Sequence, residues 1–310
     1  MKDSQEFPQT LIEAVRYFSD SQACVDLLAE MRWPDGVTCP HCGSQDVRYL
    51  RTRQRWECKA KHPKRQFSVM VGTIFERSHI GLDKWLAAIW MLANAKNGVS
   101  SYELARALGI TQKSAWFVLH RIRVAMQTRT FAKLSGEVEI DETFIGGKAR
   151  NMHKGKRKVK GRGAVGKAIV MGMLERHGNA MLHVVPNTDR QTLQRKIRQH
   201  VEAGSRVYTD ALASYASLEG DYFHAVIDHA EAYAEGNVHT NCLENFWSLL
   251  KRSIHGTYVS VEPFHLFRYL DEQAFRFNNR ENTDCERFLR VVNSVAGKRL
   301  ECKNLVGWPS

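Results

Sequence analysis

A carboxylate and an ammonium group share one face of the helix that the sequence predicts for residues 239–251, HTNCLENFWSLLK. Glu244 and Lys251 stand seven positions apart, which is nearly two turns at 3.6 residues per turn, so both side chains project from the same side. Asn241 lies on that side too. The opposite side is an apolar stripe that would pack against a core; it comprises Leu243, Trp247, Leu250 and Ile254. A packed helix that presents an acid and a lysine can position a metal ion and a phosphate.

Two aspartates elsewhere could complete a metal site with Glu244. Asp141 belongs to EVEIDETFIGG, where apolar and acidic residues alternate as in a half-buried strand, and Asp210 ends the short run RVYTD. Two divalent ions roughly 3.5–4 Å apart can activate an attacking oxygen and stabilise a leaving oxygen on a phosphodiester. Mg²⁺ and Mn²⁺ prefer carboxylate oxygens. The sequence therefore predicts two Mg²⁺ (or Mn²⁺) ions on these three acids; nearby alternatives are Glu137, Glu139, Glu142 and Asp228.

The overall charge indicates a polyanionic partner. The 310 residues carry a formal net charge of +12 and a sequence pI of about 9.4, which favours nucleic acid. No apolar run approaches the roughly 20 residues that span a bilayer, and the N-terminus shows no signal peptide, so we expect a cytoplasmic protein with no membrane partner. Together with the acids, the charge predicts a metal-dependent enzyme that cuts and joins DNA.

The positive charge is concentrated in residues 148–162, KARNMHKGKRKVKGR, which hold eight Lys or Arg and no acid. This segment follows Asp141 closely, and we expect it to clamp DNA through phosphate contacts that give affinity without sequence choice. A disordered, solvated loop is the alternative. The predicted contacts are Lys148, Lys154, Lys156, Arg157, Lys158, Lys160 and Arg162.

Four residues within 37–77 have the spacing of zinc ligands. Cys39 and Cys42 form a Cys-x2-Cys pair followed by a glycine, and Cys58 and His62 supply a second half. Such paired halves predict one structural zinc ion in a closed tetrahedron that does no chemistry. His62 is the least certain ligand, because His41 lies nearby. The seven cysteines are an odd number, which does not suggest a disulfide framework.

Residues 78–128 predict three helices, of which the last two form a helix-turn-helix pattern. Ser100 and Glu103 make a capping box, Gly109 provides the turn, and Thr111 caps the final helix. A plain helical hairpin is the alternative. The polar face of the final helix would offer DNA four side chains, Gln112, Lys113, His120 and Arg123.

The large C-terminal region predicts strands first and then alternating elements. We expect strands near 138–141, 168–174, 181–185, 207–208 and 224–227, a helix opened by a capping box of Thr188 and Gln191, and mostly helices from residue 240. This order favours an α/β fold with a mixed sheet flanked by helices. The predicted organisation is a helical lead-in (1–36), a zinc ribbon (37–77), a helix-turn-helix segment (78–130), a catalytic domain (136–285) and a C-terminal tail (286–310).

Motifs in this order resemble bacterial insertion-sequence transposases of the ISXO type, which belong to the DDE superfamily and have a ribonuclease-H-like fold. The resemblance runs from about residue 20 to residue 281 and rests on RWPDGVTCPHCGS, RQFSVMVGTIF, IDETFIGGK, VYTDALASY, HTNCLENFWSLLKR, GTY and RYLDEQAFRFNNR. It implies that Asp141, Asp210 and Glu244 bind the catalytic metals and that Lys251 contacts a phosphate. It also implies double-stranded DNA as partner, both terminal inverted repeats and target, and a homodimer or larger assembly.

The chain departs from the family pattern at one point, because the second half of the ribbon usually has two cysteines and here has Cys58 and His62. Some relatives have asparagine in the third acidic position, where this chain has Glu244, with Asn241 as an auxiliary candidate. Two other classes stay open, namely a non-catalytic DNA-binding regulator and a metal-dependent nuclease without joining activity. A tyrosine recombinase is rejected, since no suitable histidine pair or arginine set accompanies a tyrosine.

Overall fold

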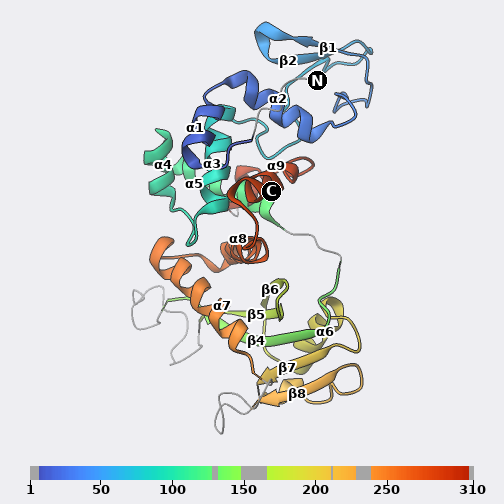
Figure 1. The fold of residues 1–310 in the computed structure, drawn as a ribbon, viewed down its shortest axis with the longest axis vertical. Helices are drawn as coiled ribbons and strands as arrows, with labels where there is room; N and C mark the ends of the chain where they lie inside the picture. Colours follow the sequence, from blue (N-terminus) through green and yellow to red (C-terminus); the bar gives the residue numbers. More distant parts are fainter. Residues whose placement is uncertain (1–6, 128–131, 148–165, 211, 228–238, 307–310) are drawn as a thin grey trace. The chain divides into compact units, whose positions relative to one another are not determined.

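The computed structural model of the chain describes residues 7–127, 132–147, 166–210, 212–227 and 239–306 (Figure 1). The chain divides into two compact units. Residues 1–127 together with 281–310 form one, and residues 128–280 form the other. Within the described ranges, none of the helices has both the length and the apolar character needed to traverse a bilayer.

The first unit begins with two capped helices and a small sheet. A capping box of Thr10 and Glu13 opens α1 (Leu11–Phe18), and the Asp20 carboxylate caps α2 (Ser21–Arg32). The strands β1 (Val47–Leu50), β2 (Arg55–Cys58) and β3 (Gln66–Phe67) then pair antiparallel in that order. This sheet confirms the strand-containing ribbon that the cysteine spacing predicted.

Three helices follow the ribbon, as predicted: α3 (Leu82–Asn94), α4 (Ser101–Leu108) and α5 (Gln112–Met126). The capping box of Ser100 and Glu103 is present, Gly109 is left-handed with φ of 60°, and Thr111 accepts the Ser114 N–H. Glycine adopts the left-handed conformation with little strain because it lacks a Cβ, so the chain can turn here between α4 and α5. The predicted pair of helices and the glycine turn between them are confirmed, and their role as a DNA-binding helix-turn-helix stays a prediction.

Two further helices, α9 (Asp284–Asn293) and α10 (Cys302–Val306), also belong to the first unit. Residues 286–310 were predicted to be a C-terminal tail. In the structure the Phe288 ring lies 5.3 Å from Phe18 and 5.4 Å from Trp90, measured between centroids. The chain therefore returns to complete the core of its first unit.

The second unit is built on a five-stranded mixed sheet with the order β6-β5-β4-β7-β8 (Figure 1). Its antiparallel half comprises β4 (Glu137–Ile145), β5 (Ala168–Glu175) and β6 (Ala180–Val185). The strands β7 (Arg206–Asp210) and β8 (Phe223–Ile227) run parallel to β4. In chain order this is a 3-2-1-4-5 sheet, which confirms the predicted ribonuclease-H-like α/β fold.

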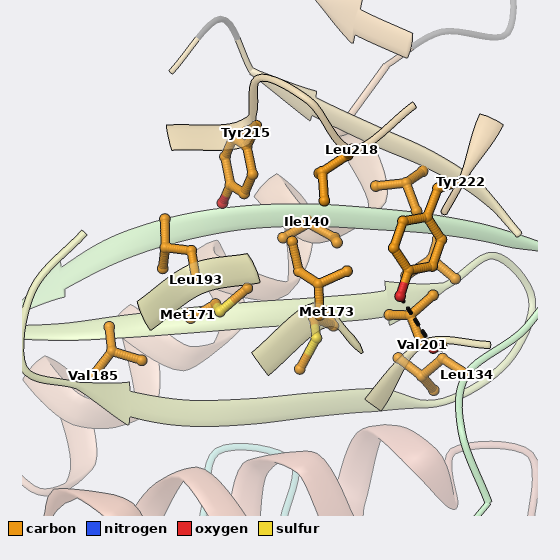
Figure 2. Close-up of a cluster of buried hydrophobic side chains, with 13 residues drawn as sticks. Leu134, Ile140, Met171, Met173, Val185, Leu193, Val201, Tyr215, Leu218 and Tyr222 are labelled. Atoms are coloured by element: carbon orange, nitrogen blue, oxygen red, sulfur yellow. Dashed lines mark hydrogen bonds between the residues drawn. The ribbon is translucent and has the colours of Figure 1, made fainter. Parts of the chain in front are cut away.

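Helices cover both faces of this sheet. The helix α6 (Arg190–His200) packs on one face, where Leu193 and Ile197 join Val138 and Ile140 in a buried cluster. Figure 2 shows this cluster, with the Tyr222 hydroxyl donating to the Val201 carbonyl oxygen. The predicted capping box of α6 is wrong, since Asp189 rather than Thr188 accepts the Thr192 N–H.

The other face is covered by α7 (Asn241–Arg252) and α8 (Leu266–Asn278). A π-helical turn (Ser253–Thr257) continues α7, and a 3₁₀ turn (Pro263–His265) precedes α8. At the C-terminal end of α8, the Asn278 amide accepts the Ala180 N–H at 2.7 Å and donates to the Ala180 carbonyl oxygen at 3.0 Å. The side chain thus satisfies backbone groups of the edge strand β6, which limits pairing with another chain.

Candidate active site and metal centre

The parallel pairing of β4 and β7 sets Asp141 and Asp210 side by side. Glu139 pairs with Tyr208 in this register, and each aspartate follows its member of that pair by two residues. Because side chains alternate along a strand, both aspartates project from the same face as Glu139 and Tyr208. That face is the one covered by α7.

Trp247 from α7 holds the Asp141 carboxylate in place. Its indole Nε1–H donates to Asp141 Oδ2 at 2.8 Å, and the Glu142 N–H donates to Asp141 Oδ1 at 2.7 Å. Asp210 is also oriented, because its Oδ1 accepts the Leu212 N–H at 3.2 Å. The sequence predicted Trp247 as an apolar core residue. It is buried, and its one polar atom, Nε1, donates the hydrogen bond to Asp141.

The three predicted acids lie within electrostatic range of one another. Burial raises the pKa of the Asp141 carboxyl; the hydrogen bonds from Trp247 and Glu142 oppose this, and the charges of Asp210 and Glu244 raise that pKa further. Among the described residues, the three carboxylates are not gathered into a group of mutually close ligand atoms like that at the cysteines. The arrangement is an open cluster of repelling acids.

An open cleft of about 810 Å³ lies beside this cluster. Asp141 and Glu244 line its acidic part, and basic side chains of α7 and the following turn line the remainder. Asp210 and Asn241 are not among the lining residues described. The full lining is Asp141, Glu142, Thr143, Glu244, Trp247, Ser248, Lys251, Arg252, His255 and Gly256. The cleft therefore combines cation-binding and anion-binding groups.

Glu139 fixes the start of α7 on the sheet. Its carboxylate is fully buried, accepts the Leu243 N–H at 2.9 Å and pairs with Arg176 Nε at 2.9 Å. Arg176 also donates to the His239 carbonyl oxygen at 2.9 Å and stacks over the Tyr208 ring at 4.2 Å. A carboxylate that accepts an orphan N–H in the first turn stabilises a helix. This network sets the placement of the helix that carries Glu244 and Lys251.

Gly172 makes room for Trp247. It pairs with Asp141 across β4 and β5, and a Cβ added to Gly172 would lie 2.6 Å from two atoms of the Trp247 ring. We expect Gly172→Ala to lower the free energy of unfolding by about 1–3 kcal/mol, because the ring must move. Chemical denaturation measures this. The matched control is Gly147→Ala, where an added Cβ meets nothing within 4 Å; equal losses in both variants would contradict the role of Gly172.

Glu142 projects from the opposite face of β4 and is held by Tyr215. Burial raises the pKa of the Glu142 carboxyl to about 7; the Tyr215 hydroxyl, which donates to it, opposes the rise, and the charges of Asp141 and Asp210 add to it. Tyr215 lies in the buried cluster of the α6 face. Glu142 is thus tied to a core tyrosine, and its backbone N–H rather than its carboxylate contacts Asp141.

The ribbon gathers its four predicted ligands. One ligand atom from each of Cys39, Cys42, Cys58 and His62 lies within 4.8 Å of the others. The Cys39 Sγ to His62 Nε2 distance is 3.5 Å, and the Cys42 Sγ to Cys58 Sγ distance is 3.6 Å. A tetrahedron around zinc with bonds of about 2.3 Å has edges of roughly 3.7 Å. The geometry supports a structural zinc ion, with His62 rather than His41 in the group.

We expect Cys58→Ser to lose the bound zinc, since three ligands do not close a structural site. The nearby Trp56 is 7% exposed in this ribbon, so its fluorescence should shift to longer wavelength as the fold opens. Metal analysis of the purified chain measures the first effect and emission spectra the second. Cys302→Ser, at an exposed cysteine of α10, is the control and should keep about one zinc per chain. Full zinc in the Cys58 variant would refute this assignment.

The predicted DNA contacts of the helix-turn-helix segment are only partly accessible. His120 and Arg123 are 0% and 1% exposed, so their predicted presentation on a polar surface is wrong. The reason is that α3, α4 and α9 all pack against α5. Lys113 is exposed and Gln112 is half-buried; both stay predictions. The seven predicted contacts within 148–162 lie outside the described residues.

Comparison with known proteins shows the family to which this chain belongs. The profile of a transposase zinc-ribbon domain matches residues 19–60, and that of the ISXO2-like transposase domain matches residues 133–278. An uncharacterized transposase-like protein of Haemophilus influenzae is 37% identical over 99 residues, which are 32% of this chain and 80% of that protein. The chain belongs to the ISXO2-like transposase family. The predicted resemblance is confirmed.

Two other likenesses accompany the family match. An uncharacterized protein in transposable element ISH50 of Halobacterium salinarum is 28% identical to this ISXO2-like transposase over 253 residues, which are 77% of the chain and 84% of that protein. A chain from the crystal structure of a pre-cleavage Mos1 transpososome aligns over 94% of this chain and 98% of its own length, with 14% identity and a TM-score of 0.26. That score is too low to bear on the fold, which rests on the strand order.

Proposed function

We propose that this ISXO2-like transposase catalyses DNA transposition, in which metal-dependent cleavage at the ends of an insertion sequence is followed by transfer of the 3′ hydroxyl into target DNA. The observation that carries the proposal is that Asp141 and Asp210 project from one face of the paired strands β4 and β7, and that Glu244 of α7 lines the same cleft as Asp141 and Lys251. Catalysis of phosphoryl transfer is mostly positioning and electrostatic stabilisation, and these elements supply both.

The three acids fit divalent cations. All offer carboxylate oxygens, which suit Mg²⁺ or Mn²⁺, and each Asp141 oxygen accepts one N–H, which leaves a lone pair on each for a cation. Burial, and after it the charges of Asp210 and Glu244, raise the pKa of Asp141, and bound cations would favour its charged form. Two such ions, when bound, would activate the attacking oxygen and stabilise the leaving one.

The side chains have distinct roles in this proposal. Asp141 and Asp210 are held by hydrogen bonds from Trp247 and Leu212, so the acid positions are set before DNA binds. Lys251 would neutralise a phosphate in the cleft, and Asn241 is an auxiliary group at the start of the same helix. In the first step water attacks a phosphodiester at the end of the element, and the bond that breaks releases a 3′ hydroxyl. In the second step that hydroxyl attacks a target phosphodiester and displaces a 3′ hydroxyl of the target strand, with the same three acids serving both steps. No protein side chain forms a covalent bond with DNA.

Double-stranded DNA is the proposed partner, both as the terminal inverted repeats and as the target. The net charge of +12 supports a polyanion, and the helix-turn-helix segment supports duplex recognition through Gln112 and Lys113. The lysines and arginines of residues 148–162 would add phosphate contacts. Two ends must be joined, so we propose a homodimer or larger assembly on DNA.

A single joining reaction tests the proposal. Purified full-length protein is incubated with labelled duplexes that carry the ends of the element, a target plasmid and Mg²⁺. Labelled plasmid is the expected product. Nicked duplex without joining would indicate a nuclease, and shifted but uncut duplex would indicate a non-catalytic regulator; either outcome contradicts the proposed function.

A further inference from the structure

The π-helical turn that follows α7 brings an unassigned histidine into the cleft. The turn covers Ser253–Thr257, and the Tyr258 N–H donates to the Ser253 carbonyl oxygen at 3.1 Å. His255 is exposed and lines the cleft with Lys251. Turns of this kind are rare and occur often at functional sites. His255 comes eleven residues after Glu244, close to three helical turns, so it extends the functional face of α7.

Buried contacts on both sides of His255 hold this turn. Before it, Ser253 is 2% exposed and Ile254 is 4% exposed, and the Ser253 hydroxyl lies 3.4 Å from the amide oxygen of Gln273. The turn is therefore attached to α8, while His255 itself faces solvent.

After the turn, Tyr258 donates its hydroxyl to Glu272, a fully buried carboxylate of α8 that also accepts from Arg276. We call Tyr258, Glu272 and Arg276 the brace. A buried carboxylate costs stability unless it is paired, and here its partners are a neighbouring arginine and the tyrosine that ends the turn. The brace thus attaches the end of the turn to α8, so the position of the turn depends on these buried contacts.

The cleft residues near His255 have the chemistry of a phosphate site. Glu244 and Asp141 lie in its acidic part, whereas Lys251 and Arg252 give the remainder a positive charge. Residues four apart on a helix are neighbours, with Cβ atoms about 5–6 Å apart. A phosphate held by Lys251 would thus lie within reach of an imidazole N–H of His255.

We propose that His255 is a second phosphate-contacting residue of the cleft and that the brace positions it there. The inference rests on the proposed function, because it takes the DNA strand as the ligand. Lys251 and His255 would hold the sugar-phosphate backbone on the side of the cleft away from the acids. The brace residues would act only through the turn, as positioning residues.

The first test measures the affinity of the full-length protein for end duplexes without added Mg²⁺, so that no cleavage occurs. His255→Ala should weaken binding roughly tenfold, the loss expected for a hydrogen bond to a charged phosphate oxygen. His255→Lys, which also donates to phosphate, should restore the affinity. His79→Ala, at an exposed histidine of the first unit, should not change it. An unchanged affinity in His255→Ala would overturn the inference.

A double-mutant cycle tests the brace. Tyr258→Phe removes the hydroxyl that donates to Glu272 and should weaken binding in the wild-type background. In the His255→Ala background it should have no further effect, because the brace acts through His255. Thermal denaturation checks that the variants fold. If Tyr258→Phe does not fold, Ser253→Ala, which removes the other side-chain contact between the turn and α8, replaces it in the cycle. Additive losses would overturn the positioning role.

These outcomes separate the inference from the function on which it rests. If the wild-type protein joins DNA and His255→Ala binds it equally well, the inference fails and the proposed function stands. If the wild-type protein does not bind duplex DNA, both fail. Binding that depends on His255 without any joining would support the phosphate contact and contradict only the joining reaction.

Discussion

Asp210→Asn is expected to lower the rate of strand transfer roughly 10³-fold or more, the scale of loss when an essential catalytic group is removed. Asparagine has nearly the shape of aspartate and can still accept the Leu212 N–H that holds Asp210 at 3.2 Å. Its neutral amide, however, neither attracts divalent cations strongly nor neutralises them. The fall should therefore occur without loss of fold. Joining assays under single-turnover conditions measure it.

The control for this variant is Asp221→Asn, at an exposed aspartate that pairs with Arg198 on the surface. It makes the same chemical change away from the cleft and should join DNA at the wild-type rate. Asp210→Asn should also keep its affinity for end duplexes, since phosphate contacts come from basic groups. A variant at Asp210 that joins strands at the wild-type rate would refute the assignment of the site.

The sequence predicted the elements of the site well because their patterns are local. The stripe that runs from Leu243 to Ile254 is buried as expected, since a 3.6-residue period is visible in any single segment. The strand that carries Asp141 and the one that ends at Asp210 were likewise predicted from short runs. Their pairing in one sheet, which sets Asp141 beside Asp210, comes from the structure, because no local pattern shows which strands are neighbours.

What the sequence did not predict depends on distant partners. Glu139 was one of the alternative metal ligands, but α7 covers it, it is 0% exposed, and its carboxylate contacts Arg176 and the Leu243 N–H. Its partner Arg176 lies in another part of the chain, so no local pattern marks the pair. No local pattern indicates why residue 172 is a glycine, because the constraint is the distant Trp247 ring that lies against it. A glycine inside an apolar strand run was the one available signal of a close approach.

The first unit shows the same limit. The helical period of α5 was predicted correctly, but the face with His120 and Arg123 was assigned to DNA because polar residues are usually exposed. In the structure α9, from the segment set aside as a tail, also contacts it. A long-range return of the chain changes which residues are buried without changing any local pattern.

Arg176→Ala should lower the free energy of unfolding by about 3–5 kcal/mol, the cost of removing one partner from a buried ion pair. Arg176 and Glu139 side chains are 8% and 0% exposed, and their atoms Nε and Oε1 lie 2.9 Å apart. The charge left on Glu139 would be buried beside the first turn of α7. Strand transfer should fall further than stability alone explains, because that helix carries Glu244 and Lys251. Urea denaturation and joining assays measure the two effects.

Arg198→Ala provides the matched control, since the Arg198–Asp221 pair is 49% and 45% exposed and an exposed pair contributes about 0–1 kcal/mol. A second comparison isolates the buried charge. In the Arg176→Ala background, Glu139→Gln should recover part of the lost stability, because a neutral amide can still accept the Leu243 N–H without leaving an unpaired carboxylate in the interior. If Arg176→Ala and Arg198→Ala cost the same, or if Glu139→Gln adds a further loss, Glu139 does not hold α7 through its charge, and the placement of Glu244 must depend on apolar packing alone.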